Sequence, residues 1–179
     1  MLVAYEQMYD QDRQDWKYTR KNIERGFKVK CEGFEFWGKM DLFASRVSRK
    51  RRINFLVDHK TASKIDENFI GRLPLDTQMR GYVYGAQKDF GLQPNEVVYD
   101  VIKKCKLRGK SNETQKEFDE RIALDYCSRP SFYYHREYLK YSQNDVRAFE
   151  EEMYQCNSEF QHILKQPGFL DPRSWLPND

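Results

Sequence analysis

The sequence predicts a mixed α/β (α+β) fold, with a central mixed β-sheet flanked by helices, in a single domain over residues 1–179. A chain of 179 residues suits one sizeable core. Hydrophobic residues make up 39% and charged residues 33% of the chain, which is a globular balance and not a disordered one. Runs with helical and strand-like periodicity also alternate along the chain, which favours a sheet covered by helices.

The first part of the chain predicts a helix followed by antiparallel strands. Four apolar side chains recur at helical steps, namely Tyr5, Tyr9, Trp16 and Ile23. Gly26 is the expected end of this helix. Strand-like runs follow at residues 27–31 and 34–43, and the basic stretch 46–52 is expected to be a hairpin loop. The apolar run at residues 53–58 predicts a further strand, which ends in a charge.

Helices and strands continue to alternate in the second part. Residues 76–90 predict a helix, with Asp76 at its N-terminus, where a carboxylate is favoured. The β-branched run 96–102 predicts a strand. Residues 112–126 are expected to be helical and residues 132–139 extended, so the element order fits a mixed sheet flanked by helices.

The last predicted helix carries six apolar side chains at steps of three and four. They are expected to be core residues and not a cofactor site, and they are Val146, Phe149, Met153, Cys156, Phe160 and Ile163. Pro167 and Gly168 are the expected end of this helix.

Charge is clustered along the chain. The net charge of +3 does not by itself indicate a nucleic-acid partner. Basic runs at residues 46–52 and 103–110 are more informative, because clustered cations suit a phosphate backbone. The first run supplies five cations as candidate DNA-binding residues, which are Arg46, Arg49, Lys50, Arg51 and Arg52. The alternative is that these stretches are solvated loops or strand ends.

The cysteine spacing indicates neither a zinc ribbon nor a disulfide framework. There are four cysteines and no Cys-x-x-Cys pair. The sequence has no recognisable signal peptide, and no apolar run approaches the roughly 20 residues that span a bilayer. We therefore expect reduced thiols, a cytoplasmic location and no membrane partner.

Asp41 ends the tetrapeptide Gly-Lys-Met-Asp within a strand rich in aromatic residues. Strict alternation places it on the same face as Trp37 and Phe43. A lone carboxylate is unfavourable in such surroundings, so a metal or a cation is the expected partner.

A second acidic motif is Val-Asp-His-Lys at residues 57–60. Asp58 and Lys60 lie two apart at a strand end, so their side chains point the same way. They form either a simple salt bridge or a metal ligand beside a charge that acts on water. With Asp41 on a neighbouring strand, Asp58 would complete a hard-oxygen site for Mg²⁺ or Mn²⁺. The side chain of His59 should face away, in a core or supporting role.

The third motif is Gln-Met-Arg-Gly-Tyr at residues 78–82. Gln78 and Tyr82 are four apart on a predicted helix and therefore share a face. An amide and a phenol there are able to hydrogen-bond a phosphate or a base edge. The alternative is an ordinary half-buried pair.

These three motifs, in this order, resemble the RecB-type branch of the PD-(D/E)XK nucleases. Downstream runs look like the phage exonucleases of that branch, so the resemblance spans roughly residues 24–139. It implies a restriction-endonuclease-like core and metal-assisted hydrolysis of phosphodiester bonds. Asp41 and Asp58 would bind the metal, helped by the backbone carbonyl of His59. Lys60 would position or deprotonate the attacking water and stabilise the charge on the phosphate.

The resemblance implies further site residues. Gln78 and Tyr82 would hold the DNA strand near the site. The family usually carries an acidic residue or a histidine on its first helix, for which Glu24 is the first candidate and Glu6 the second. Some relatives hold an iron–sulfur cluster with cysteines after the last helix. This chain lacks them there, so no cluster is expected in it; either this branch has none or the chain is a fragment that lacks terminal segments.

The first hypothesis is therefore an exonuclease or end-processing deoxyribonuclease in DNA replication or recombination. Its partners would be DNA and a recombination or replication protein, in the cytoplasm of the host cell if the protein is phage-encoded. An endonuclease or nickase of the same superfamily is the alternative within this class. Two other classes are a non-catalytic DNA-binding module on this fold and a small structural subunit with chance motifs.

Overall fold

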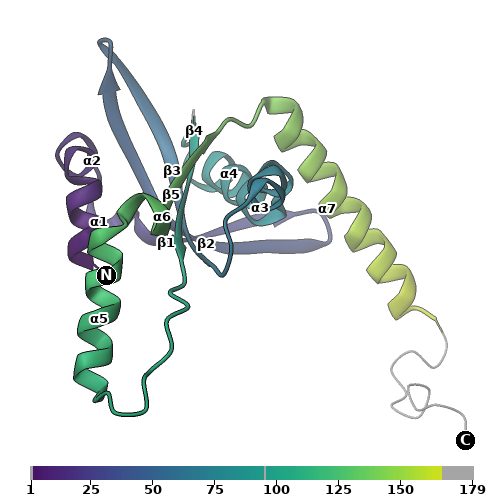
Figure 1. The fold of residues 1–179 in the computed structure, drawn as a ribbon. Helices are drawn as coiled ribbons and strands as arrows, with labels where there is room; N and C mark the ends of the chain where they lie inside the picture. Colours follow the sequence, from purple (N-terminus) through teal and green to yellow (C-terminus); the bar gives the residue numbers. More distant parts are fainter. Residues whose placement is uncertain (1, 95, 167–179) are drawn as a thin grey trace, which may run out of the picture.

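The computed structural model describes residues 2–94 and 96–166, which form a five-stranded mixed sheet with helices against it (Figure 1). The strands are β1 (Ile23–Cys31), β2 (Phe34–Ser48), β3 (Arg51–Ala62), β4 (Glu96–Lys103) and β5 (Tyr134–Leu139). They lie in chain order across the sheet. β3 and β4 are parallel and the other neighbours are antiparallel. The predicted mixed sheet with flanking helices is confirmed.

Helices cover the sheet in two groups. The described helices are α1 (Leu2–Met8), α2 (Asp10–Asp15), α3 (Glu67–Arg72), α4 (Thr77–Phe90), α5 (Gln115–Ser128), α6 (Pro130–Tyr133) and α7 (Gln143–Leu164), with short 3-10 turns at Arg20–Asn22 and Leu73–Leu75. α4 packs on β1 and β2 and is joined there by α7, whereas α1 packs with α5 and α6 (Figure 1). None of the helices in the described ranges is both long and apolar enough to cross a membrane.

The chain between β3 and β4 positions α4. Parallel neighbours need a crossover connection, and α3 and α4 supply it. Asp76 begins α4 as its N-cap, because its carboxylate accepts a hydrogen bond of 2.9 Å from the backbone N–H of Gln78. Gly91 ends the helix with φ of 61°, a left-handed conformation that favours glycine. The predicted position of Asp76 is therefore confirmed.

A phenylalanine ring fixes the distance between α4 and the sheet. Phe27 on β1 is buried between two glycines, Gly38 on β2 and Gly85 on α4. A Cβ atom at Gly38 would lie 2.3 Å from the ring, and one at Gly85 would lie 2.5 Å from it. Only glycine therefore allows the helix, the ring and the strand to pack this closely.

The opening helix is shorter than predicted. It breaks after Met8, resumes as α2 and stops at Asp15, and the residues Ile23 and Gly26 belong to β1. The chain leaves the helix because Lys17 bridges to Ser45, with two backbone hydrogen bonds of 2.7 and 2.9 Å. Strand pairing thus overrides the helical spacing.

The basic stretch 46–52 is a hairpin, as predicted, but most of it is strand and only its middle is a tight turn. β2 continues to Ser48 and β3 begins at Arg51, so Arg49 and Lys50 alone form the turn. Both have positive φ, 48° and 64°, as a type I′ hairpin turn requires. β3 also continues to Ala62, so Asp58 and Lys60 lie inside a strand and not at its end.

Only the first half of α7 belongs to the core. Val146 and Phe149 are buried and Met153 packs against the core, as predicted. Cys156, Phe160 and Ile163 are exposed, which corrects the prediction that they are core residues. Figure 1 shows the reason: this end of α7 extends away from the sheet. The expected helix end at Pro167 and Gly168 lies outside the described residues.

We expect Gly85→Ala to lower the free energy of unfolding by about 1–3 kcal/mol, because the new methyl group would overlap the buried Phe27 ring. Gly71→Ala in α3 is the matched control. Nothing lies within 4 Å of its added Cβ, so this change should be neutral or stabilising. Chemical denaturation measures both, and equal effects of the two changes would contradict the close packing at Gly85.

Candidate active site

Asp41 lies where β2 changes partners. The paired register of β2 with β3 begins at Leu42, whereas its pairing with β1 extends from Phe34 to Leu42. β3 meanwhile stays paired with β4 as far as Ala62. The Asp41 carboxylate takes the place of a strand partner at this junction, because it accepts a hydrogen bond of 2.9 Å from the backbone N–H of His59.

The side-chain alternation of β2 breaks at the same place. Met40 and Phe43 both belong to the larger core cluster, whereas Leu42 belongs to the smaller one. Strict alternation would place Met40 and Phe43 on opposite faces, so the predicted grouping of Asp41 with Phe43 is wrong. The break in alternation lies beside Asp41, where β2 passes from pairing with β1 to pairing with β3.

Lys60 is the centre of a polar cluster on the face of the sheet that α4 covers. Its Nζ lies 3.0 Å from Asp58 Oδ2 and 3.1 Å from Asp76 Oδ2. It also donates a hydrogen bond of 2.9 Å to Gln78 Oε1. The Gln78 amide in turn donates one of 2.6 Å to the hydroxyl of Tyr82. We call these five residues the Lys60 cluster.

The Lys60 cluster joins motifs that are far apart in the sequence. The predicted residues Asp58, Lys60, Gln78 and Tyr82 all belong to it. Asp41 is close enough for its charge to affect the pKa values of Asp58 and Tyr82. Gln78 and Tyr82 share a face of α4, as predicted.

Burial and charge act against each other at Asp58 and Lys60. Burial raises the pKa of Asp58, the charges of Asp41 and Asp76 add to this, and Lys60 offsets only part of the shift. Burial alone would lower the pKa of Lys60, but the attraction of Asp58 and Asp76 outweighs it and the net pKa is raised. Asp58 and Asp76 therefore favour the charged form of Lys60.

The oxygen atoms at this site suit a hard cation. Asp58 is 3% exposed, and none of the donors in the described ranges is aligned for a hydrogen bond to its Oδ2, although Lys60 pairs with this oxygen by charge. With Asp41 and the backbone carbonyl of His59, it offers the donors that Mg²⁺ and Mn²⁺ prefer. Across the described residues, no group of three or more His, Cys, Asp or Glu side chains is gathered as a metal site.

The side chain of His59 lies on the opposite face of the sheet, as predicted. Its Nδ1 is 3.6 Å from Asp41 Oδ2 and its Nε2 is 3.8 Å from Asp100 Oδ2. Asp100 is fully buried and pairs with Arg136 at 2.9 Å. Sequence reasoning did not single out Asp100, because its burial depends on β5, which pairs with β4 to bring Arg136 opposite it.

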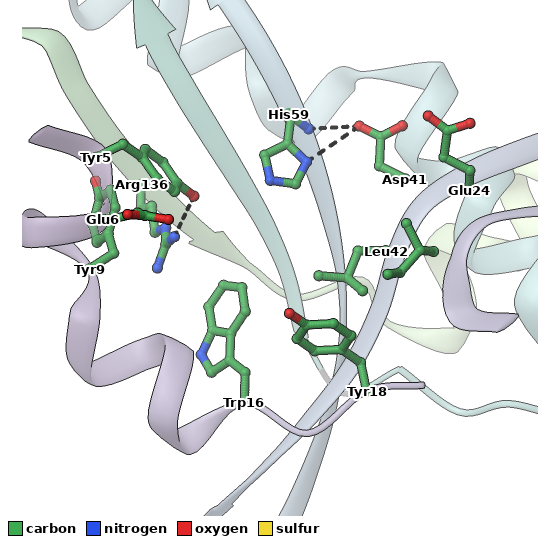
Figure 2. A pocket seen from close by; sticks show the side chains of 11 residues that line it. Tyr5, Glu6, Tyr9, Trp16, Tyr18, Glu24, Asp41, Leu42, His59 and Arg136 are labelled. Atoms are coloured by element: carbon green, nitrogen blue, oxygen red, sulfur yellow. Dashed lines mark hydrogen bonds and ion pairs between the residues drawn. The ribbon is translucent and has the colours of Figure 1, made fainter. Parts of the chain in front are cut away.

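A cavity of about 630 Å³ opens on this second face, between the sheet and the N-terminal helices (Figure 2). We call it the aromatic cavity. Asp41 and His59 line it, and so do both candidates for the first-helix acid, Glu24 and Glu6. Glu24 lies in β1 and not on a helix, and its pKa is lowered by a hydrogen bond of 2.7 Å from Lys39. Glu6 is the candidate that α1 carries.

The predicted DNA-binding cations differ in their surroundings. Arg46 pairs with Glu96 at 2.7 Å, and Arg52 donates a hydrogen bond of 3.3 Å to the hydroxyl of Ser45. Arg49, Lys50 and Arg51 are exposed at the hairpin turn. At roughly 3.3 Å per residue of strand, this turn is on the order of 25 Å from Asp41 and Asp58.

Comparisons with known proteins assign no family to this chain. No model of a known protein family matches it, and no curated protein does either. The function of the site therefore has to be inferred from its own geometry.

We expect Asp58→Asn to stabilise the fold at neutral pH by about 1 kcal/mol, because it removes a buried charge. The pKa of Asp58 is raised, so ionisation of this group costs stability above that pKa, and the cost disappears as the pH falls through it. The advantage of the variant should therefore shrink with falling pH. Denaturation curves at several pH values measure this.

Asp66, the N-cap of α3, is the matched control, because Lys64 and the backbone N–H of Phe69 lower its pKa. Asp66→Asn should therefore change stability in the opposite direction. If Asp58→Asn were less stable than the original protein at neutral pH, the ion pair with Lys60 would outweigh the burial of Asp58.

Proposed function

We propose that this chain is a metal-dependent deoxyribonuclease of the PD-(D/E)XK type that acts as an exonuclease or end-processing enzyme. The observation that carries the proposal is the convergence of three separate motifs at one junction of the sheet. Asp41 and Asp58 lie on neighbouring strands, and Lys60 is joined through Gln78 to Tyr82. A chance match of short motifs gives no reason for this convergence.

Each residue has a role that follows from its place. Asp41 and Asp58, with the backbone carbonyl of His59, would hold Mg²⁺ or Mn²⁺. Such an ion, when bound, polarises a phosphate and lowers the pKa of the attacking water. The ammonium of Lys60 is held by Asp76 and Gln78 beside these carboxylates. It would stabilise the negative charge that develops on the phosphate.

Gln78 and Tyr82 would bind the DNA strand. Gln78 is exposed and Tyr82 half-buried, and the hydrogen bond between them orients both side chains. Neutral donors of this kind contact phosphate oxygens without reading the sequence. They would hold the scissile strand next to Lys60.

The hairpin turn at Arg49 and Lys50 would contact DNA at a distance from the scissile phosphate. A distance on the order of 25 Å corresponds to roughly seven nucleotides of stacked strand. The turn would therefore bind the backbone of the flanking DNA, while Arg46 stays paired with Glu96 and has a structural part.

The direct test is a gel assay with end-labelled linear DNA and closed circular DNA, with and without Mn²⁺. We expect Mn²⁺-dependent loss of label from the linear substrate and an intact circle. Cleavage of the circle would indicate the endonuclease alternative. Binding of DNA with no cleavage of either substrate would indicate a non-catalytic module. Asp58→Ala should abolish both cleavage and the binding of Mn²⁺ measured by calorimetry.

We expect Lys60→Ala to slow cleavage by roughly two to four decades, the scale of losing one charged transition-state contact. Mn²⁺ binding should change little, because both carboxylates remain. Lys60→Arg should keep much of the activity, because the raised pKa of Lys60 indicates a cation and arginine preserves the charge. Full activity in Lys60→Ala would rule out this role.

We expect Arg49→Asn/Lys50→Gly to weaken DNA binding and to flatten its salt dependence, because two phosphate contacts are lost. The same change should raise stability, since Asn-Gly suits the positive φ values of this turn. Binding measured over a salt series checks the first effect. An unchanged salt slope in the more stable variant would mean that the turn is merely solvated.

A further inference from the structure

The aromatic cavity and the Lys60 cluster meet at Asp41. The cluster lies on the face of the sheet that α4 covers, and the cavity lies on the opposite face. Asp41 lines the cavity, and its charge acts on Asp58 in the cluster. The mouth of the cavity is therefore within reach of the sugar and base of a nucleotide whose phosphate lies at these carboxylates.

Exposed apolar side chains gather at this mouth. Tyr18 is 49% exposed and Ile23 is 46% exposed, and both line the cavity with Leu42. Tyr18 makes no ring contact or hydrogen bond with any residue in the described ranges. Its ring face is therefore available for stacking. Figure 2 shows Tyr18 and Trp16 across the cavity from His59 and Asp41.

Buried and ion-paired groups line the rest of the cavity. Trp16 is buried and packs edge-on to Phe55, with ring centroids 4.8 Å apart. Arg136 is fixed by Asp100 and by a hydrogen bond of 2.7 Å to the hydroxyl of Tyr5. The imidazole of His59 is about half exposed at the cavity wall. Aromatic walls beside polar groups match a nucleobase, which has apolar faces and a polar edge.

We propose that the aromatic cavity holds an unpaired nucleobase next to the scissile phosphate, with Tyr18 stacked on it. This inference rests on the proposed nuclease function and names its substrate class. A base in a duplex is paired and stacked on its neighbours, so it enters such a cavity only after it leaves the helix. DNA with an unpaired end is therefore the preferred substrate, because no base pair has to be opened.

The test is the binding of two single-stranded oligonucleotides that differ only at the terminal residue, which is 2-aminopurine in one and abasic in the other. Ca²⁺ replaces Mg²⁺ or Mn²⁺, so that the carboxylates stay neutralised while cleavage is suppressed, and the measured quantity is the ratio of the two dissociation constants. We expect a preference for the base of roughly tenfold, from one stacking contact, and quenching of 2-aminopurine fluorescence. Tyr18→Ala should abolish both effects, and Tyr18→Phe should retain them.

Tyr154→Ala on α7 is the matched control, because this tyrosine is also exposed but lies outside the cavity. It should leave the ratio unchanged. Tyr18 is exposed at the cavity mouth, and an unchanged circular dichroism spectrum verifies that its variants fold. The proposal is overturned if the original protein shows no preference for the base, or if Tyr18→Ala keeps that preference.

The outcome separates this proposal from the nuclease assignment. Loss of the preference in Tyr18→Ala, in a protein without metal-dependent cleavage, would support the base site and refute the nuclease function. If cleavage depends on Asp58 and Lys60 but the ratio of the two dissociation constants is unchanged in Tyr18→Ala, the base site alone is refuted.

Discussion

The ammonium of Lys60 is the contact on which the arrangement of the site depends. It touches the central strand β3 and the beginning of α4 together, through Asp58 on one side and Asp76 and Gln78 on the other. Asp76 also caps α4, so the same carboxylate that starts the helix anchors it to the sheet. The close packing of Phe27 against Gly38 and Gly85 sets the distance between α4 and the sheet, and so allows Lys60 to reach both.

Several local rules are broken near this contact. Asp58 is buried against its preference, the alternation of β2 fails beside Asp41, and Glu24 opposite it has a positive φ of 47°. Each feature costs folding free energy, and such costs gather where a protein keeps side chains in place for chemistry. The core elsewhere follows ordinary patterning, with Val97, Val98 and Val101 fully buried in β4.

Much of the fold could be predicted from periodicity and capping. The β-branched run of β4 and the Asp76 cap are local signals, and the structure has both. The opening helix was predicted too long because the bridge between Lys17 and Ser45 is a contact between distant residues. The pairing of Asp58 with Lys60 and that of Gln78 with Tyr82 could be predicted, because each pair shares a face of a regular element. The meeting of the two pairs was implied only by the family resemblance. Asp76 and Asp100 could not be assigned to the site, because their partners come from other parts of the chain.

The parallel pairing of β3 with β4 has a consequence for the order of assembly. The hairpins β1–β2 and β2–β3 join residues close in sequence, whereas β4 must wait for the whole α3–α4 crossover. Contacts of short sequence separation form fastest during folding. Asp41 and Asp58 are therefore brought together first, with Lys60 already beside Asp58 on β3. The partners of Lys60 on α4 arrive only when the crossover docks, so the complete Lys60 cluster is among the last features that the folding chain acquires.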